Sequence, residues 1–436
     1  MKMRILLAIL STLLSATALG ADFPTAREWN RQVAAGWNLG NQLESCPWTW
    51  ENETLALGNP DYADDAETGW GNPKVTKEMI DAVRAAGFNA VRIPVRWQCH
   101  IVNAETMTVS PTWMKRVKEV VDYCIDNDML VIINTHHDKW IESCATNAYR
   151  EQTCRRLTLL WTQIAQAFAD YDYRLAFAGT NEVHLPDNWS APTAENQNVQ
   201  NAYNQAFVDA VRATGGNNLK RHLIVQTYAC NHSYGLSGLV IPTDTYGNGN
   251  DYMSVEFHYY VPYEYCNSTQ YYYWGEPYKQ YGVPSSGNET AMKTAFNAIQ
   301  RQWGQKGLGV VIGEWGVSDH WDKATNQQRI HDCMTYYCKT LVSEARDRGF
   351  STFVWDNNVF GNGTEKFGIF DRNNQMNIRA KWILDGIFQA IPASVPSVYS
   401  TSIPTISRPY FHQGRIVIRK GNVVYNLRGG VEKIID

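Results

Sequence analysis

Short apolar runs alternate with longer amphipathic segments along the chain, from about residue 30 to residue 390. The short runs are rich in Val, Ile, Leu and Phe and end on Gly or polar residues, which is typical of buried strands. Eight such runs are predicted strands: 33–39, 88–95, 130–135, 174–179, 222–227, 252–258, 308–314 and 351–356. Most are followed by helical periodicity, most clearly at 75–86, 111–127, 155–170, 199–214, 327–347 and 378–390.

Regular alternation of strands and helices implies parallel strands joined by right-handed crossovers. Eight such units within a few hundred residues predict an α/β fold, a closed (β/α)8 TIM barrel. The alternative is an open doubly wound sheet, which would place a glycine-rich phosphate-binding turn after its first strand. GWNLGN at 36–41 does not have the GxGxxG pattern of that turn, so the barrel is favoured.

The two ends of the chain differ from the barrel region. Residues 1–20 carry Lys2 and Arg4 before an apolar stretch, and then small residues, which is typical of a secretory signal peptide. The apolar stretch is shorter than the ~20 residues of a spanning helix, so we expect no membrane span and a secreted or cell-surface protein. Residues 392–410 are rich in Pro and Ser and read as a linker, and 411–436 alternate as a short β-rich appendage. The barrel domain is therefore predicted at 21–391.

Charge and aromatic content narrow the partners. The net charge of −4 gives no indication of a nucleic-acid partner or an anionic membrane, and we expect a monomer. The 16 Trp and 24 Tyr often stand beside polar and glycine-rich stretches. Flat rings on presumed loops suit ligands with flat apolar faces, such as sugar rings.

Nine cysteines in an exported chain permit disulfides, with at least one left over. Three pairs fall on the same or neighbouring loops and are candidate bridges: Cys46 with Cys99, Cys144 with Cys154, and Cys230 with Cys266. The others lie in helical patterns and are expected to be buried thiols: Cys124, Cys333 and Cys338. No spacing is typical of a zinc site.

Polar or aromatic side chains stand at nearly every predicted strand end, where the active site of a TIM barrel lies. The residues concerned, and expected at the substrate site, are Asn41, Arg92, His136, His137, Asn181, Glu182, His258, Tyr260, Glu314 and Trp355. Each alone has a structural explanation, such as packing or an ion pair. Together they are hard to explain as structure, because a barrel interior is filled by branched apolar side chains.

Two glutamates stand out among these residues. Glu314 ends a buried strand in VIGEWG (311–316), where a carboxylate costs free energy unless it is paired. Glu182 follows a strand across the barrel mouth. Glycoside hydrolysis uses such a pair, one carboxyl protonated and the other ionised, so their environments must push the two pKa values apart. We expect Arg92 and Tyr260 to keep Glu314 ionised.

The run His136-His137-Asp138 raises the alternative of a metal site. Adjacent residues on a strand point to opposite faces, so we expect that the two histidines do not share an ion. No metal and no cofactor are therefore predicted. Asn181 is placed to bond a sugar 2-hydroxyl, and Trp355 to form the floor of the sugar site.

Longer motifs connect these residues: GWNLGN (36–41), WGNP (70–73), GFNAVRIPVRW (87–97), VIINTHHDKW (131–140), GTNEVH (179–184), AFVDAVRATGGNN (206–218), VEFHYY (255–260), IGEWG (312–316) and FVWDNN (353–358). Together they resemble glycoside hydrolase family 5, and most of all its subfamily 4, whose members cut β-1,4-glucans, mixed-linkage glucans and xyloglucan. The resemblance implies a retaining double displacement with Glu182 as acid/base and Glu314 as nucleophile. It also implies sugar-site roles for six residues: Arg92, His136, Asn181, His258, Tyr260 and Trp355.

One position departs from the family, which usually has proline after the acid/base glutamate. Val183 stands there and is expected to leave Glu182 more backbone freedom without abolishing its role. The tail at 411–436 resembles, in a shorter form, the β-rich sorting tails of type IX secretion.

We therefore predict a secreted endo-β-1,4-glucanase acting on cellulose-like or mixed-linkage glucan. A xyloglucan- or mannan-specific hydrolase of the same mechanism remains open, because substrate choice depends on loops such as those with Trp48, Trp50, Trp70 and 271–274. A barrel that binds glucan without cutting it is disfavoured, because both carboxylates are present.

Overall fold

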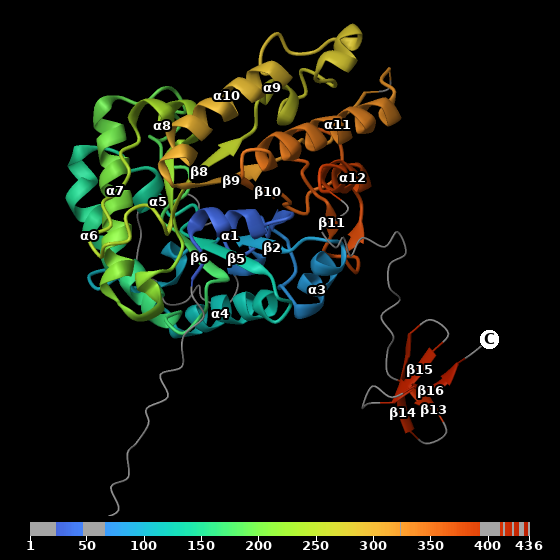
Figure 1. Cartoon of the computed structure of the whole chain (residues 1–436), viewed down its shortest axis with the longest axis horizontal. Coiled ribbons are helices and arrows are strands. Elements are labelled where there is room, and N and C mark those ends of the chain that lie inside the picture. Colours follow the sequence, from blue (N-terminus) through green and yellow to red (C-terminus); the bar gives the residue numbers. More distant parts are fainter. Residues whose placement is uncertain are drawn as a thin grey trace, which may run out of the picture.

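The computed structural model describes residues 23–46, 66–322 and 324–392, and the backbone of four strands between Tyr410 and Ile434. Eight parallel strands close into a barrel in the order β1-β10-β9-β8-β7-β6-β5-β2 (Figure 1). Their bounds are β1 Gly36–Asn38, β2 Ala90–Ile93, β5 Leu130–Asn134, β6 Leu175–Ala178, β7 Leu223–Asn231, β8 Met253–Tyr259, β9 Gly309–Trp315 and β10 Ser351–Val354. Every predicted strand is present, and the predicted (β/α)8 barrel is confirmed.

Helices surround this barrel and connect its strands. They are α1 Ala26–Gln32, α3 Lys77–Ala85, α4 Pro111–Ile125, α5 Lys139–Glu142, α6 Asn147–Ala167, α7 Ala194–Ala213, α8 His232–Gly238, α9 Tyr263–Cys266, α10 Glu289–Gln302, α11 Gln327–Arg346 and α12 Lys381–Gln389. Helix α7 begins earlier than its predicted start at 199, because Thr193 and Asn196 form a capping box. The apolar periodicity missed this polar first turn.

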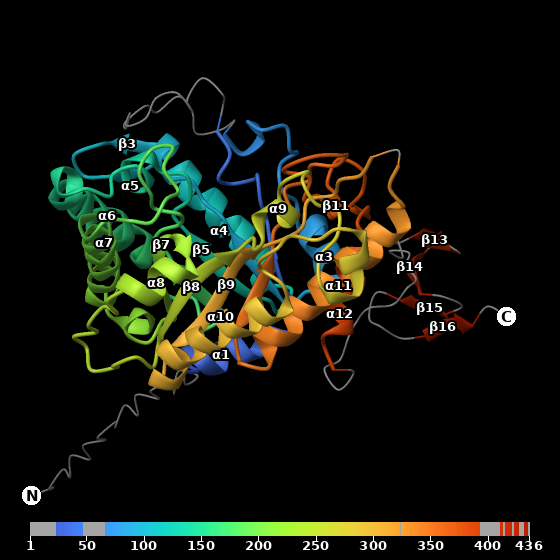
Figure 2. The ribbon, with the colours of Figure 1, turned by 90° about the horizontal axis from the view of Figure 1, so that it is seen from above.

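Helix α1 closes the N-terminal end of the barrel. Trp29 of α1 and Val33, which directly follows the helix, pack on inward-facing residues of the strands, such as Ile132, Val311 and Phe353. Figure 2 shows α1 at one end of the strands, and β3 (Ile101–Asn103) and α9 at the other. The open end is therefore the C-terminal end of the strands, where TIM-barrel sites lie.

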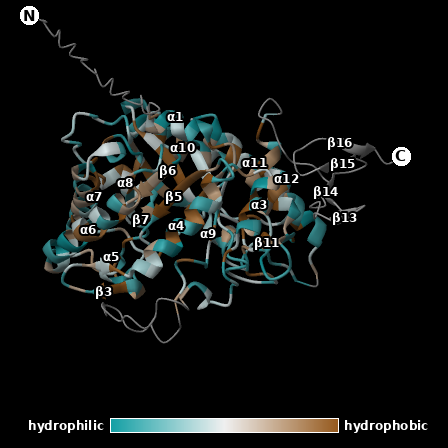
Figure 3. Cartoon of the chain, turned by 90° about the horizontal axis from the view of Figure 1, so that it is seen from below, coloured by the Kyte–Doolittle hydropathy of each residue, from teal (hydrophilic) through white to brown (hydrophobic). Residues whose placement is uncertain are grey.

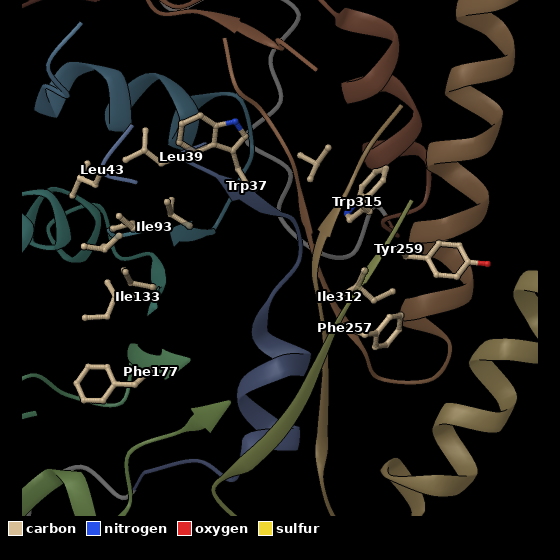
Figure 4. Packing of buried hydrophobic residues seen from close by; sticks show 14 of the residues in the cluster. Trp37, Leu39, Leu43, Ile93, Ile133, Phe177, Phe257, Tyr259, Ile312 and Trp315 are labelled. Carbon is tan, nitrogen blue, oxygen red and sulfur yellow. The ribbon is translucent and has the colours of Figure 1, made fainter. Parts of the chain in front are cut away.

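The second apolar layer lies between the strands and the helices. Phe257 and Ile312 belong to this cluster, and Figure 4 shows them with Trp315 and Tyr259 on the side of the strands that faces the helices. Apolar colours in Figure 3 gather on the barrel strands, whereas the outer helix faces and the loops are mainly polar. The barrel interior and this outer layer together fix the positions of the strand ends.

Strand β9 contains a bulge directly before its glutamate. Relative to β8 and β10, it has one extra residue between Ile312 and Trp315. A β-carbon on Gly313 would lie 1.8 Å from the Glu256 carboxylate, so a larger residue there would require the Glu256 side chain to move. Such a bulge re-aims the side chain beside it. Here it directs Glu314 toward the barrel mouth while Trp315 stays in the outer apolar layer.

The C-terminal tail forms a four-stranded antiparallel sheet in the order β13-β14-β15-β16. Its strands are β13 Tyr410–His412, β14 Arg415–Lys420, β15 Val423–Asn426 and β16 Val431–Ile434. The predicted β-rich appendage is therefore present. The predicted signal peptide at 1–20, most of the predicted linker (393–409), Trp48 and Trp50 lie outside the described residues.

None of the three candidate cysteine pairs forms a disulfide in the described chain. Cys46 and Cys99 do pack on each other in a small buried cluster. Cys266, a candidate partner of Cys230, contacts the Tyr337 hydroxyl at 3.3 Å. The thiols predicted to be buried are buried: Cys124, Cys333 and Cys338.

Candidate active site

A cleft of about 860 Å³ opens at the C-terminal ends of the strands. Eight of the ten predicted site residues line it: Asn41, His136, His137, Glu182, His258, Tyr260, Glu314 and Trp355. They come from loops or strand ends all around the barrel. The strand-end argument therefore found the cleft.

The other two predicted residues, Arg92 and Asn181, lie behind the cleft wall. Arg92 is 0% exposed and Asn181 is 1% exposed, and neither lines the cleft. Arg92 donates to Glu314 through Nη1 at 2.9 Å and to Asn181 through Nη2 at 2.9 Å. Arg92, which was predicted at the substrate site, thus holds other site residues from behind the cleft wall.

Glu314 receives both of the contacts that the sequence suggested. Its Oε1 pairs with Arg92, and its Oε2 accepts from the Tyr260 hydroxyl at 3.2 Å. Burial nevertheless raises the pKa of Glu314 above its ordinary value of 4.5, although His258 and Arg92 act to lower it. His258 and Arg92 thus limit the effect of burial on this carboxyl but do not overcome it.

Glu182 stands in a more open environment. Its side chain is 23% exposed, against 7% for Glu314. Its Oε1 lies 2.6 Å from His258 Nδ1. The carbonyl of the following Val183 accepts from the Ala229 amide at 2.9 Å, so the backbone beside Glu182 is held by β7 where the family usually has proline.

The two carboxylates are close enough to act on one bond. One oxygen of Glu182, one of Glu314 and one ring nitrogen of His258 all lie within 4.8 Å of one another. Retaining glycosidases hold their carboxyl groups about 5–5.5 Å apart, whereas inverting enzymes need about 6.5–9.5 Å. The spacing fits retention.

These three residues also form a possible metal cluster by distance alone. The donor set does not favour an ion, because Glu314 already pairs with the Arg92 guanidinium. The pKa of His258 lies well above 6.5, because Cys230 and the facing carboxylates of Glu314 and Glu182 outweigh the effect of burial. A protonated imidazole offers no lone pair to a metal.

His136 and His137 correct one step of the sequence argument. Strand β5 ends at Asn134, and His137 has a φ of +57°, so the alternation of a strand does not apply to them. Both line the cleft, with ring centroids 4.3 Å apart. The two ring nitrogens of His136 are covered by the side-chain amides of Asn134 at 3.1 Å and Asn181 at 3.4 Å.

The aromatic loop residues divide into lining and packing residues. Trp70 lines the cleft, as do Trp189 and Tyr263, which the sequence analysis did not single out. Tyr273 and Trp274, which it did, are buried in the outer layer. Nothing in the local sequence separates these cases, because both kinds of loop are aromatic and polar.

Glu256 was also missed, although a signal was present. It lies two residues before His258 on β8, and residues i and i+2 of a strand share a face. The inward position of His258 therefore implied an inward Glu256. Its carboxylate is fully buried beside Arg92 and His258.

Comparison with known proteins agrees with this geometry. The family model described as Cellulase (glycosyl hydrolase family 5) matches residues 56–361. Endoglucanase B of Clostridium cellulovorans is 34% identical over 378 residues, which are 84% of this chain and 76% of the relative. Cellulase/esterase CelE of Acetivibrio thermocellus is 35% identical over 370 residues, 83% of this chain but only 39% of the relative.

Two solved structures are similar over most of the chain. One is the GH5-4 broad specificity endoglucanase from Ruminococcus champanellensis with bound cellotriose, with TM-score 0.72 and 34% identity over 84% of this chain and 99% of that one. The other is the Bacteroides ovatus GH5 xyloglucanase in complex with a XXXG heptasaccharide, with TM-score 0.74 and 31% identity over 85% and 78%. These matches confirm the prediction of a family 5 hydrolase related to the subfamily 4 endoglucanases. The chain belongs to glycosyl hydrolase family 5.

Proposed function

We propose that the chain is a retaining endo-β-1,4-glucanase with Glu314 as nucleophile and Glu182 as acid/base. The observation that carries the proposal is the pair of carboxylates within 4.8 Å in an open cleft. An inverting enzyme needs room for a water molecule between its two carboxyl groups, and the separation of Glu182 and Glu314 is too short for one. It suits direct attack of a carboxylate on the anomeric carbon.

The first step transfers a proton and forms an ester. Protonated Glu182 gives its proton to the glycosidic oxygen while Glu314 attacks the anomeric carbon, and the aglycone leaves. The Arg92 contact at 2.9 Å supports the charged form of Glu314 before attack. In the second step Glu182, now ionised, takes a proton from water, and that water cleaves the ester and frees Glu314.

The two sides of the cleft are suited to the two parts of the substrate. The strand order places the loops with His136 and Trp355 on one half of the mouth and those with Trp189 and Tyr263 on the other. The His136 and Trp355 rings are parallel within 10°, with centroids 6.0 Å apart. We assign the reacting sugar to this half and the leaving chain to the half with Trp189. A cleft that continues past the carboxylates on both sides is what internal cleavage requires.

Xyloglucan is the second candidate substrate. The cleft is open to solvent, and one similar structure is that of a xyloglucanase with its oligosaccharide. Reducing-sugar release should be measured side by side on carboxymethylcellulose, lichenan, xyloglucan and glucomannan. The proposal expects activity on the first two, with rapid loss of viscosity. Xyloglucan as the best substrate would change the preferred glucan and leave the mechanism intact, and activity on none of the four would contradict the proposal.

Export and surface attachment are further proposals. We propose that residues 1–20 are removed on secretion, that the monomeric enzyme acts outside the cell, and that the β-rich tail serves sorting. No helix in the described ranges is long and apolar enough to cross a membrane. N-terminal sequencing and sedimentation of protein recovered from the culture medium test these points. An intact leader or a stable dimer would contradict them.

A further inference from the structure

We propose that Glu256 is a positioning residue for both carboxylates of the site, acting on Glu182 through His258 and on Glu314 through Arg92. The proposal rests on the roles given above to Glu182 and Glu314. It adds a third glutamate that does not touch the cleft.

Glu256 stands where the two supports of the site meet. Its Oε1 lies 3.0 Å from Arg92 Nε and 3.4 Å from His258 Nε2. None of these three atoms makes a hydrogen bond among the described residues, so both contacts are ion pairs in which Glu256 Oε1 is the facing charge. Its Oε2 accepts from Gln226 Nε2 at 2.7 Å, which fixes the carboxylate plane.

The same two supports reach the reacting groups with their other atoms. His258 Nδ1 lies 2.6 Å from Glu182 Oε1 and 3.6 Å from Glu314 Oε2. Arg92 Nη1 lies 2.9 Å from Glu314 Oε1. A continuous path of charged groups thus runs from Glu182 through His258, Glu256 and Arg92 to Glu314.

Charge balance explains why a third carboxylate belongs here. Before the first step Glu182 is protonated, and Glu314 and Glu256 are ionised. Arg92 and a protonated His258 then make the buried group neutral, as a poorly solvated site requires. A doubly protonated His258 places its charge 3.4 Å from Glu256 and can donate to Glu182 through Nδ1. The other oxygen of Glu182 is then left to carry the proton for the leaving group.

The surroundings of His258 favour that protonation state. The carboxylates that face it come from three elements: Glu256 on β8 itself, Glu182 after β6 and Glu314 on β9. Cys230 on β7 lies against the same ring, and its interaction with His258 also raises the pKa of the imidazole, while burial raises the pKa of the thiol to about 12. The nearby ring of His136 is neutral, because burial lowers its pKa well below 6.5. Arg92 is the facing cation, and it is itself paired with two of the carboxylates.

Space for Glu256 is built into β9. A β-carbon at Gly313 would collide with its Oε1, as described for the bulge. Glu256 thus occupies the space that a side chain at position 313, directly before the nucleophile, would need. Two features of the sequence, the glutamate two positions before His258 and the glycine one position before Glu314, describe one contact.

The test is Glu256→Gln in the full chain, with Glu67→Gln as matched control. Glu67 is also buried and paired with an arginine, Arg116, but it does not line the cleft. In Glu256→Gln the new amide oxygen must accept from Gln226, so the amide NH2 faces Arg92 Nε and His258 Nε2. A positively charged His258 is then no longer balanced by a carboxylate, and we expect it to lose its second ring proton. We expect kcat to fall about 10- to 100-fold, the range for residues that orient a reacting group, with KM nearly unchanged. The basic limb of kcat/KM should move to higher pH, because a neutral imidazole favours ionised Glu182 less than an imidazolium does.

Nitrogen NMR of ¹⁵N-histidine protein reports the same point directly, with His258→Asn for assignment. We expect an imidazolium at pH 6 in wild type and a neutral ring in Glu256→Gln. Neutral His258 in wild type at pH 6 would overturn the proposal even if Glu256→Gln fails to fold. The proposal would also be overturned if Glu256→Gln had the same basic limb of kcat/KM as wild type and a kcat within twofold of it. Failure of the glucanase proposal is recognised separately, by full activity of Glu314→Gln.

Discussion

The two halves of the barrel mouth hold their side chains in different ways. On the half formed by β10, β1, β2 and β5, cleft residues rest on buried polar groups, with His136 2% exposed above fully buried Arg92. On the half formed by β6, β7 and β8, Trp189 is 54% exposed and Tyr263 is 60% exposed. Trp189 is braced mainly by a stacked His184 at 3.8 Å. The chemistry is thus placed on a rigid frame, and chain recognition on exposed rings.

This difference has a physical reason. Groups that stabilise a charged transition state must be fixed before reaction, which buried ion pairs and hydrogen bonds achieve. Rings that bind successive sugars need only a flat accessible face. Substitutions of the groups held at the strand ends, which on the second half include Glu182 and His258, should therefore reduce kcat strongly. Substitutions of the exposed rings should change binding of long substrates weakly.

The largest effect is expected for Glu314→Gln. The amide keeps the shape and the Tyr260 contact but cannot form the ester, so kcat should fall about 10⁴-fold or more. Hydrolysis rates with matched melting curves and glucan-affinity gels check this. A folded variant within tenfold of wild type would place the nucleophile elsewhere.

Glu182→Gln should be nearly as severe on polysaccharide. Loss of proton donation is expected to reduce the rate about 10²- to 10⁴-fold. On an aryl cellobioside with a good leaving group the first step needs little protonation, so the loss in that step should be much smaller. Equal losses on both substrates would contradict the acid role of Glu182.

Trp189→Ala tests the exposed half. Removing one stacking face worth ~0.5–1.5 kcal/mol should raise KM for long glucans about 2- to 10-fold, with kcat on an aryl cellobioside unchanged. Tyr246→Ala is the matched control, because Tyr246 is 50% exposed and does not line the cleft. A loss of kcat in Trp189→Ala alone would mean that this ring belongs to the frame instead.

The smallest effect concerns pH. Attack requires ionised Glu314, so the rate falls as pH drops through its pKa. Burial raises that pKa above 4.5, so the acid limb of kcat/KM should lie above pH 4.5. Initial rates on an aryl cellobioside between pH 3 and 8 measure it. An acid limb below pH 4.5 would mean that Arg92 and His258 outweigh burial.

The sequence predicted the buried polar groups at the strand ends better than the exposed aromatic residues of the loops. Strand periods place Arg92 and His258 inward because side-chain direction along a regular strand alternates. Glu314 reaches the mouth only through the bulge at Gly313, and its position after a buried strand, not the period, pointed to it. The same rule could have identified Glu256. It failed for His137, which lies beyond the end of β5 with positive φ, and it says nothing of Trp189 or Trp274. Whether a loop ring lines a cleft or packs under it depends on contacts distant in sequence, which local patterns do not encode.

The most direct test of the central claim is to trap the ester. A 2-deoxy-2-fluoro-β-cellobioside with a dinitrophenyl leaving group slows both steps but still allows the first, so the glycosyl-enzyme should accumulate. Peptide mapping by mass spectrometry then locates the sugar. The account predicts a single label on the peptide that contains Glu314, with release of active enzyme as the ester turns over. A label on Glu182, or cleavage with inversion and no label, would contradict it.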